Sequence, residues 1–167
     1  MKKLLLTTIL TAVIFFNSAI AQVTISGVKL PDKLGFSGTI REFNGGGTRV
    51  KFFVHAYVAG LYLKEKTHDA KVVVNADKPM SVRLQIISAM LTSDVMVRAI
   101  RDGFYGSLDG KIEPFKEEID LICNVFSSEP TKVGDVYDIH YVPGIGICAS
   151  KNGKVFEFSK LNTNQKK

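Results

Sequence analysis

The segment that most restricts the fold runs from Arg49 to Leu63. It is rich in valine, phenylalanine and tyrosine, and its apolar residues fall on both parities of a β-strand. Successive side chains of a strand point to opposite faces of the sheet, so a strand with this pattern needs cover on both faces. We therefore predict an interior strand, with helices on one face of its sheet and another part of the chain on the opposite face.

Two amphipathic helices are predicted in the middle of the chain. In the first, apolar residues recur every four positions, and Thr92, Ser93 or Asp94 can cap its start. The second has one apolar stripe at spacings of three and four. The stripe residues are Met96, Ile100, Phe104 and Leu108 in the first helix and Ile112, Phe115, Ile119, Ile122 and Phe126 in the second.

Shorter segments around the helices are predicted to complete the sheet. Residues 44–48 (NGGGT) are expected to form a turn that needs positive φ, and residues 69–76 a short helix or loop. Asn152-Gly153 is a strong hairpin signal. Further strands are expected at 23–30, within 34–43, and at 80–87, 136–142, 147–150 and 154–158. Together these elements predict an α+β domain with helices packed on one face of a mostly antiparallel sheet.

The first 21 residues have the order of a secretory signal peptide. Lys2 and Lys3 precede the apolar run Leu4–Phe16, and Ala19-Ile20-Ala21 provides the small residues of a cleavage site. The apolar run is shorter than the ~20 residues that cross a bilayer as a helix. We expect cleavage after Ala21, a single domain over residues 22–167 without a transmembrane span, and a periplasmic or secreted location.

Charge and cysteine usage exclude several other classes. The formal charge of +6 falls to +4 when Lys2 and Lys3 are removed, and the basic residues form no stripe, so nucleic-acid binding is not expected. Cys123 and Cys148 are expected to be buried thiols, and a disulfide between them is the alternative in an oxidising compartment.

No cofactor or metal site is expected from the motifs. The two cysteines form no CxxC pair or Cys/His cluster. The histidines have no serine, cysteine or carboxylate at the spacing of a catalytic triad or a metal site, so we expect them to be structural. They are His55, His68 and His140.

Several blocks of the sequence, in order, resemble the chalcone isomerase-like family, in particular its bacterial exported branch. The first is GGGTR at 45–49, followed by KFFVHAYVAGLYL at 51–63. The later blocks are LTSD at 91–94, GDV at 134–136, YVPGIG at 141–146 and NGK at 152–154. The resemblance spans residues 23–155 and implies an open-faced β-sandwich, in which a ligand cleft lies between a large antiparallel sheet and a helical layer. Family members continue into a further helix after the hairpin, so we expect this chain to be shortened at its C-terminus.

The resemblance also implies which residues face the ligand. Arg49 matches the arginine that holds a carboxylate in the fatty-acid binders or an enolate in the plant isomerases, as a guanidinium fork can do. Tyr57 stands where the plant enzyme has a threonine, and Met96 where it has the tyrosine that helps polarise the ketone. Gly103 stands where the plant enzyme has an asparagine, and a later threonine has no counterpart.

We therefore expect a non-catalytic binder of a fatty acid or other apolar carboxylate, with Arg49, Tyr57 and Met96 at the ligand. Catalysis needs several hydrogen-bond donors directed at the charge that develops in the transition state, and few of the matched positions still carry a donor. An intramolecular lyase acting on a phenolic enone, with Arg49 and Tyr57 as catalytic residues, is the first alternative, and a structural envelope protein is the second. On an unbroken strand Arg49 and Tyr57 would be ~26 Å apart, so both can face one ligand only if the ligand is long or if the strand bends or bulges.

Overall fold

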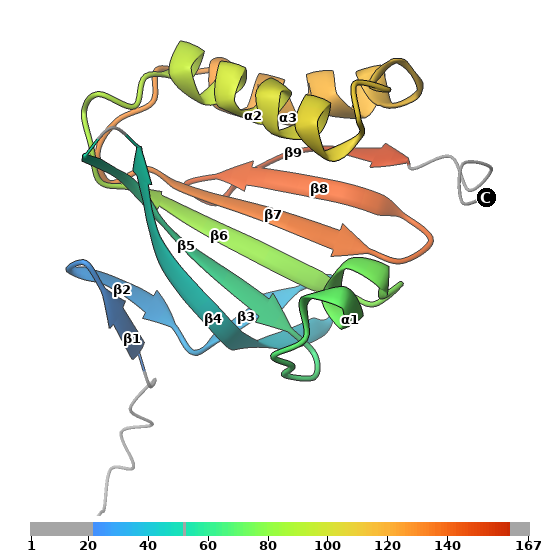
Figure 1. Ribbon diagram of the computed structural model, residues 1–167. Helices are drawn as coiled ribbons and strands as arrows, with labels where there is room; N and C mark the ends of the chain where they lie inside the picture. The colour runs from blue at the N-terminus through green and yellow to red at the C-terminus, as the bar shows by residue number, and fades with distance from the viewer. Residues whose placement is uncertain (1–21, 52, 161–167) are drawn as a thin grey trace, which may run out of the picture.

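The computed structural model describes residues 22–51 and 53–160 (Figure 1). Seven strands form one antiparallel sheet in the order β3-β4-β5-β6-β7-β8-β9, and β1 pairs with β2 in a separate hairpin. The strands are β1 (Gln22–Ile25), β2 (Val28–Pro31), β3 (Lys33–Phe36), β4 (Thr39–Lys51), β5 (Val54–Leu63), β6 (Met80–Ile86), β7 (Val136–Val142), β8 (Gly146–Lys151) and β9 (Lys154–Lys160). The helices are α1 (Ala70–Asn75), α2 (Ser93–Ser107) and α3 (Lys116–Ser127), and the 3-10 turn η1 (Glu113–Phe115) precedes α3.

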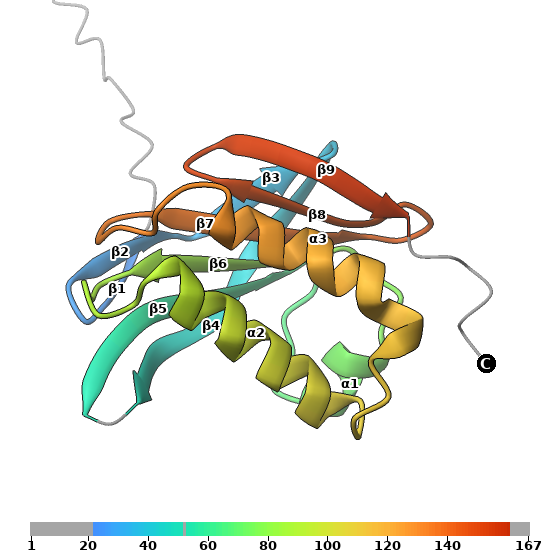
Figure 2. The ribbon, with the colours of Figure 1, turned by 90° about the horizontal axis from the view of Figure 1, so that it is seen from above.

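The sheet is covered on both faces. Helices α2 and α3 lie side by side across one face, and the β1–β2 hairpin lies on the other (Figures 1 and 2). Val58 of β5 is fully buried against Val28 and Leu30 of the hairpin. Ala56, at the start of the same strand, belongs instead to the core beneath the helices. The predicted interior strand with cover on both faces is therefore confirmed for β5.

The two predicted helices are confirmed, with one shift. Thr92 caps α2 by accepting a hydrogen bond from the Val95 N–H at 3.4 Å, as a threonine at this position does. The α-helical part of the second begins only at Lys116, because Pro114 lies in the 3-10 turn before it. The apolar stripes meet the sheet in one core of Ala56, Ile86, Leu91, Met96, Ile122, Val125, Phe126, Tyr137 and Ala149.

Three hairpins have two-residue loops that end in glycine. The predicted strand 23–30 is instead the β1–β2 hairpin, which reverses at Ser26-Gly27. The predicted strand within 34–43 is divided between β3 and β4 by Ser37-Gly38, while Asn152-Gly153 forms the predicted β8–β9 turn. In each loop both residues have positive φ, the conformation of a two-residue turn whose twist matches its strands.

The glycine-rich block does not form the predicted turn. Gly45, Gly46 and Gly47 lie within β4, paired with Leu61, Gly60 and Ala59 of β5, and none of the three has a positive φ. A Cβ atom at Gly46 would lie 3.1 Å from Cζ of Phe43, and one at Gly60 would lie 3.2 Å from Cε2 of the same ring. Glycine is required here for close packing of the Phe43 ring against the two strands.

The predicted unbroken strand over 49–63 is also wrong. β4 runs to Lys51, which pairs with Val54 at the start of β5, so the chain reverses direction inside the apolar segment. Phe53 in this loop has a φ of 64°. Aromatic residues are uncommon in such a conformation, and for this reason no turn is predicted at this position from residue types.

Both cysteines are buried free thiols, as first expected. Cys123 lies on α3 and Cys148 on β8. Burial raises the pKa of both thiols, because it disfavours the charged thiolate. They are therefore inert core residues.

The predicted signal peptide, residues 1–21, lies outside the described part of the chain. Among residues 22–51 and 53–160, no helix is long and apolar enough to cross a membrane.

Candidate functional site

Arg49 and Tyr57 are partners across two adjacent strands. Because β4 turns back into β5, the register places Arg49 directly opposite Tyr57. Opposed residues of an antiparallel pair point to the same face and have Cβ atoms about 5 Å apart. The condition of an unbroken strand, for which the separation would be ~26 Å, is therefore not met, and the structure brings the two residues together.

A β-bulge beside this pair turns β5 toward the helices. The register passes from Arg49–Tyr57 to Val50–His55, which leaves Ala56 as the extra residue of β5. Ala56 is buried and Tyr57 half-buried, and both pack into the core beneath α2 and α3. Since Arg49 shares the face of Tyr57, it lies on the helical side of the sheet, at the edge of this core.

Met96 provides the helical side of the same group. It lies in the first turn of α2, is 3% exposed and belongs to the core cluster against which Tyr57 packs. Gly103, seven residues or about two turns further along α2, is exposed and contributes no side chain. The structure thus places Tyr57 and Met96 in one apolar cluster between β5 and α2, with the exposed Arg49 opposite Tyr57 on the adjacent strand.

The Arg49 side chain is exposed, and its guanidinium has no hydrogen bond or ion pair with any side chain that the structure describes. Its guanidinium carries a permanent charge and presents a planar fork of donors. An arrangement of free cationic donors, a tyrosine and an apolar cluster can hold a carboxylate at one end and an apolar tail at the other.

A second polar group, on the opposite face of the sheet, was not predicted. Arg41 is fully buried and donates through Nη1 to the backbone oxygens of Phe36 and Thr39, at 3.2 and 3.1 Å. Its Nε and Nη2 atoms have no hydrogen-bond partner among the described residues, and neither does the buried hydroxyl of Tyr62. Tyr62 is five residues from Tyr57 on β5, so the two tyrosines point to opposite faces.

His140 belongs to this second group. Its Nδ1 lies 2.7 Å from Ser81 Oγ, and Phe36 stacks on its ring with centroids 4.0 Å apart. Burial is the largest effect and lowers the pKa of His140; Asp138 raises this pKa, whereas Arg41 and Arg83 lower it, and the net lowering favours the neutral imidazole. This group is enclosed by the β3–β4 hairpin and is separate from Arg49 and Tyr57.

Within residues 22–51 and 53–160, the remaining histidines and the carboxylates form no metal centre. His55 and His68 are both exposed, on β5 and in the loop before α1. In the part of the chain that the structure describes, no group of three or more histidine, cysteine, aspartate or glutamate side chains could hold a metal ion.

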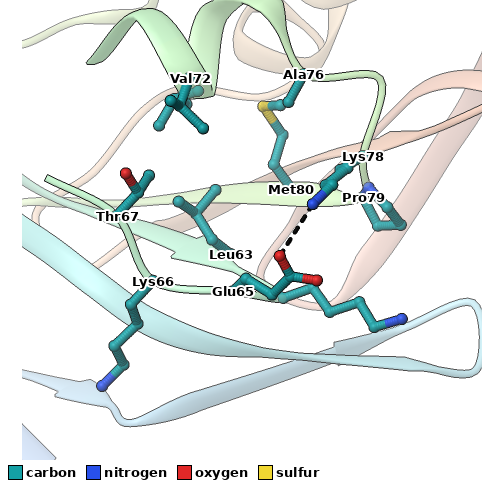
Figure 3. A pocket seen from close by; sticks show the side chains of 11 residues that line it. Leu63, Glu65, Lys66, Thr67, Val72, Ala76, Lys78, Pro79 and Met80 are labelled. Carbon is teal, nitrogen blue, oxygen red and sulfur yellow. Dashed lines mark hydrogen bonds and ion pairs between the residues drawn. The ribbon is translucent and has the colours of Figure 1, made fainter. Parts of the chain in front are cut away.

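A cavity of about 250 Å³ lies at the other end of β5, between this strand, α1 and the start of β6 (Figure 3). Leu63 and Met80 form its floor, and the ion pair of Lys78 with Glu65, at 2.9 Å, crosses its rim. It is smaller than the ~300–1,000 Å³ of ordinary ligand pockets. Leu63 is six residues beyond Tyr57, so this cavity is distinct from the Arg49–Tyr57 group.

Residues 22–160 match the family model described as chalcone isomerase-like. The chain belongs to the chalcone isomerase-like family. A search of curated proteins finds no match.

The chalcone isomerase-like fold is confirmed by a solved structure, the fatty-acid binding protein of Arabidopsis thaliana. The two structures agree with a TM-score of 0.64 over 84% of this chain and 82% of that chain, at 17% sequence identity. At this identity the likeness shows the fold, a curled antiparallel sheet with helices packed on one face, as the sequence predicted.

Proposed function

We propose that this chalcone isomerase-like chain is an exported, non-catalytic protein that binds a fatty acid or another apolar carboxylate. The observation that carries the proposal is the cross-strand pair of Arg49 and Tyr57 at the border of the apolar cluster under α2. The similar fold of a protein described as a fatty-acid binder supports the same ligand class.

The proposed ligand lies with its carboxylate at the sheet edge and its tail toward the core. The Arg49 fork and the Tyr57 hydroxyl donate to the carboxylate, since hydrogen bonds between charged partners are the strongest of their kind. The acyl chain extends toward Met96, where each buried methylene adds about 0.8 kcal/mol.

The residues at the positions of the plant catalytic site argue against catalysis. An isomerase has to stabilise the charge that develops in the transition state with several fixed donors. Met96 is a buried thioether and Gly103 has no side chain, so neither position donates. Arg49 and Tyr57 alone are sufficient to bind an anion, but they do not provide the set of donors that catalysis requires.

Export rests on the N-terminal sequence, with its two lysines, apolar run and Ala19-Ile20-Ala21. We expect the full-length chain, expressed in a Gram-negative host, to be recovered from the periplasm with Gln22 as its first residue. Intact-mass spectrometry of the periplasmic fraction measures this. A chain that stays in the cytoplasm with residues 1–21 attached contradicts the export part of the proposal and leaves ligand binding open.

Loss of the Arg49 guanidinium is expected to release the ligand. We expect wild-type protein to copurify with fatty acid, and Arg49→Ala to bind a fluorescent fatty acid about ten- to a hundredfold more weakly, because a hydrogen bond to a charged group contributes roughly 1.5–3 kcal/mol. Tyr57→Phe should weaken binding by roughly three- to tenfold. Lipid extraction with mass spectrometry and a displacement titration provide the two readouts.

Arg98→Ala is the matched control, because Arg98 is an exposed arginine on α2. It should bind like the wild type. Equal affinity of Arg49→Ala and Arg98→Ala would show that Arg49 does not anchor a carboxylate.

A further inference from the structure

The tip of the β4–β5 hairpin exposes an aromatic side chain. Phe53 is 100% exposed and adopts a φ of 64° in the two-residue loop between Lys51 and Val54. Val50, next to the loop, is 47% exposed. A large side chain in this backbone region is uncommon, and so is a fully exposed aromatic side chain.

The three other two-residue hairpin loops that the structure describes have a different residue at this position. At the corresponding second loop position they have Gly27, Gly38 and Gly153, with φ values of 80°, 70° and 82°. Glycine adopts this conformation without strain, whereas phenylalanine does not. Phe53 is therefore unfavourable both for the turn and for the surface, which is the pattern expected of a residue that is kept for an interaction.

The charge around the tip has one sign. The cations Arg49 and Lys51 flank the loop and are exposed, and His55 is exposed beside them. From Phe43 to Lys64 the sequence has no aspartate or glutamate. The hairpin therefore carries cations next to its exposed apolar end.

The neighbouring loop extends the apolar end of the tip. The N–H of Ile87, just after β6, donates to the backbone oxygen of Ala56 at 3.1 Å, which holds this loop beside the start of β5. Met90, three residues further on, is 69% exposed. Two separate loops thus present large apolar side chains near the same end of the sheet.

We propose that the hairpin tip, defined as Val50, Phe53 and the flanking Arg49, Lys51 and His55, docks on an anionic lipid surface. An aromatic side chain that projects fully into solvent can enter the interface of a bilayer, where aromatic residues are enriched. Lysine and arginine beside it attract anionic headgroups. If the proposed function also holds, this orientation places Arg49 at the surface from which a fatty acid would be taken, but docking of the tip does not depend on the ligand.

The experiment is flotation of the purified mature chain with vesicles of phosphatidylglycerol and phosphatidylcholine in equal parts. We expect the wild type to float with these vesicles, to associate weakly with phosphatidylcholine alone, and to be released at about 1 M salt, where the Debye length falls to about 3 Å. Phe53→Gly should weaken association about tenfold or more. Its melting temperature should be unchanged or higher, because glycine suits the turn, so the loss cannot result from unfolding.

Two further variants test the parts of the proposal. Lys51→Gln should weaken association about fivefold, as expected for one lysine near an anionic surface. Val74→Ser is the control, because Val74 is 82% exposed on α1, which follows the opposite end of β5, and it should float like the wild type.

Three results would overturn the proposal. The first is a wild-type chain that does not float with anionic vesicles. The second is Phe53→Gly floating as well as the wild type, or Val74→Ser losing as much as Phe53→Gly. The third is a wild-type dimer that Phe53→Gly converts to a monomer without any change in flotation, which would assign the tip to a second copy of the chain.

Discussion

Gly46→Ala is expected to destabilise the protein by about 3 kcal/mol, a cost typical of forced overpacking. A Cβ atom at Gly46 would lie 2.6 Å from the backbone oxygen of Ala59 and 3.0 Å from Cδ1 of Ile25. The contact with Ala59 cannot be relieved by rotating a side chain, because the obstructing atom belongs to the backbone of β5. The strand pair has to separate locally, or the β1–β2 hairpin has to move away from the sheet. Urea unfolding at neutral pH measures the difference.

The two neighbouring glycines are matched controls for this prediction. A Cβ atom at Gly45 or Gly47 meets no other atom within 4 Å, and neither residue has a positive φ. Gly45→Ala and Gly47→Ala should be neutral or stabilising by about 0.4–1 kcal/mol, because alanine restricts the unfolded chain. If all three variants lose similar stability, then any alanine in the block at 45–47 destabilises the protein, and the close packing at Gly46 does not explain the loss.

The helices were predictable because their signal is local. The stripe from Met96 to Phe104 and the one from Ile119 to Phe126 follow the helical period, and the stripe residues pack against the sheet in the structure. Thr92 could be recognised as a cap from its position just before the first stripe. The fold class follows from these two helices and the apolar segments around them.

The β4–β5 hairpin was hidden for the opposite reason. Its glycines lie within a strand, where they admit the Phe43 ring, and its loop contains Phe53 rather than a turn-forming residue. Local rules therefore placed the turn at residues 44–48 instead of between Lys51 and Val54, and joined part of β4 to β5 as one strand. The family resemblance identified Arg49 and Tyr57, but only the register shows that they are opposed.

Contacts between distant residues gave no signal in the sequence. Arg41 and His140 meet through Phe36 on a face that closes only when the sheet curls. The pair of Lys151 with Asp135 is another example, since each residue taken alone has the pattern of a surface charge. Burial in three dimensions, rather than residue type, decides the role of these groups.

Lys151 and Asp135 form a buried ion pair that anchors the loop between α3 and β7. Lys151 Nζ lies 3.1 Å from Asp135 Oδ2, and the two side chains are 4% and 11% exposed. The ammonium also donates to the backbone oxygens of Glu129 and Pro130, at 3.2 and 3.0 Å. The carboxylate accepts from the Lys132 N–H and from Asn152 Nδ2, each at 2.9 Å. The pair thus joins this loop to the β8–β9 hairpin.

Removing either partner alone is expected to cost about 3–5 kcal/mol, because it leaves the other charge buried without its counterion. We expect this loss for Lys151→Met and for Asp135→Asn in urea unfolding at neutral pH. The double variant should be more stable than either single one, since it removes both charges. Lys154→Met is the control, because its ion pair with Glu129 is exposed and contributes about 0–1 kcal/mol. Additive losses in the double variant would contradict a coupled pair.

Acid provides an independent test of the same pair. Burial alone would raise the pKa of Asp135, but hydrogen bonds from Asn152, the Lys132 N–H and Lys151 outweigh it and hold the pKa below its usual range. A carboxyl group with a lowered pKa stabilises the folded state above its unfolded pKa of about 4, and this contribution is lost as the pH falls through the folded pKa. In Lys151→Met the carboxylate has lost its counterion, so protonation of Asp135 relieves an unpaired charge instead of breaking a bond. The stability gap between the wild type and Lys151→Met should therefore narrow between neutral pH and about pH 3. A gap that stays constant over this range would show that Lys151 stabilises the loop through its packing and carbonyl contacts and not through the charge of Asp135.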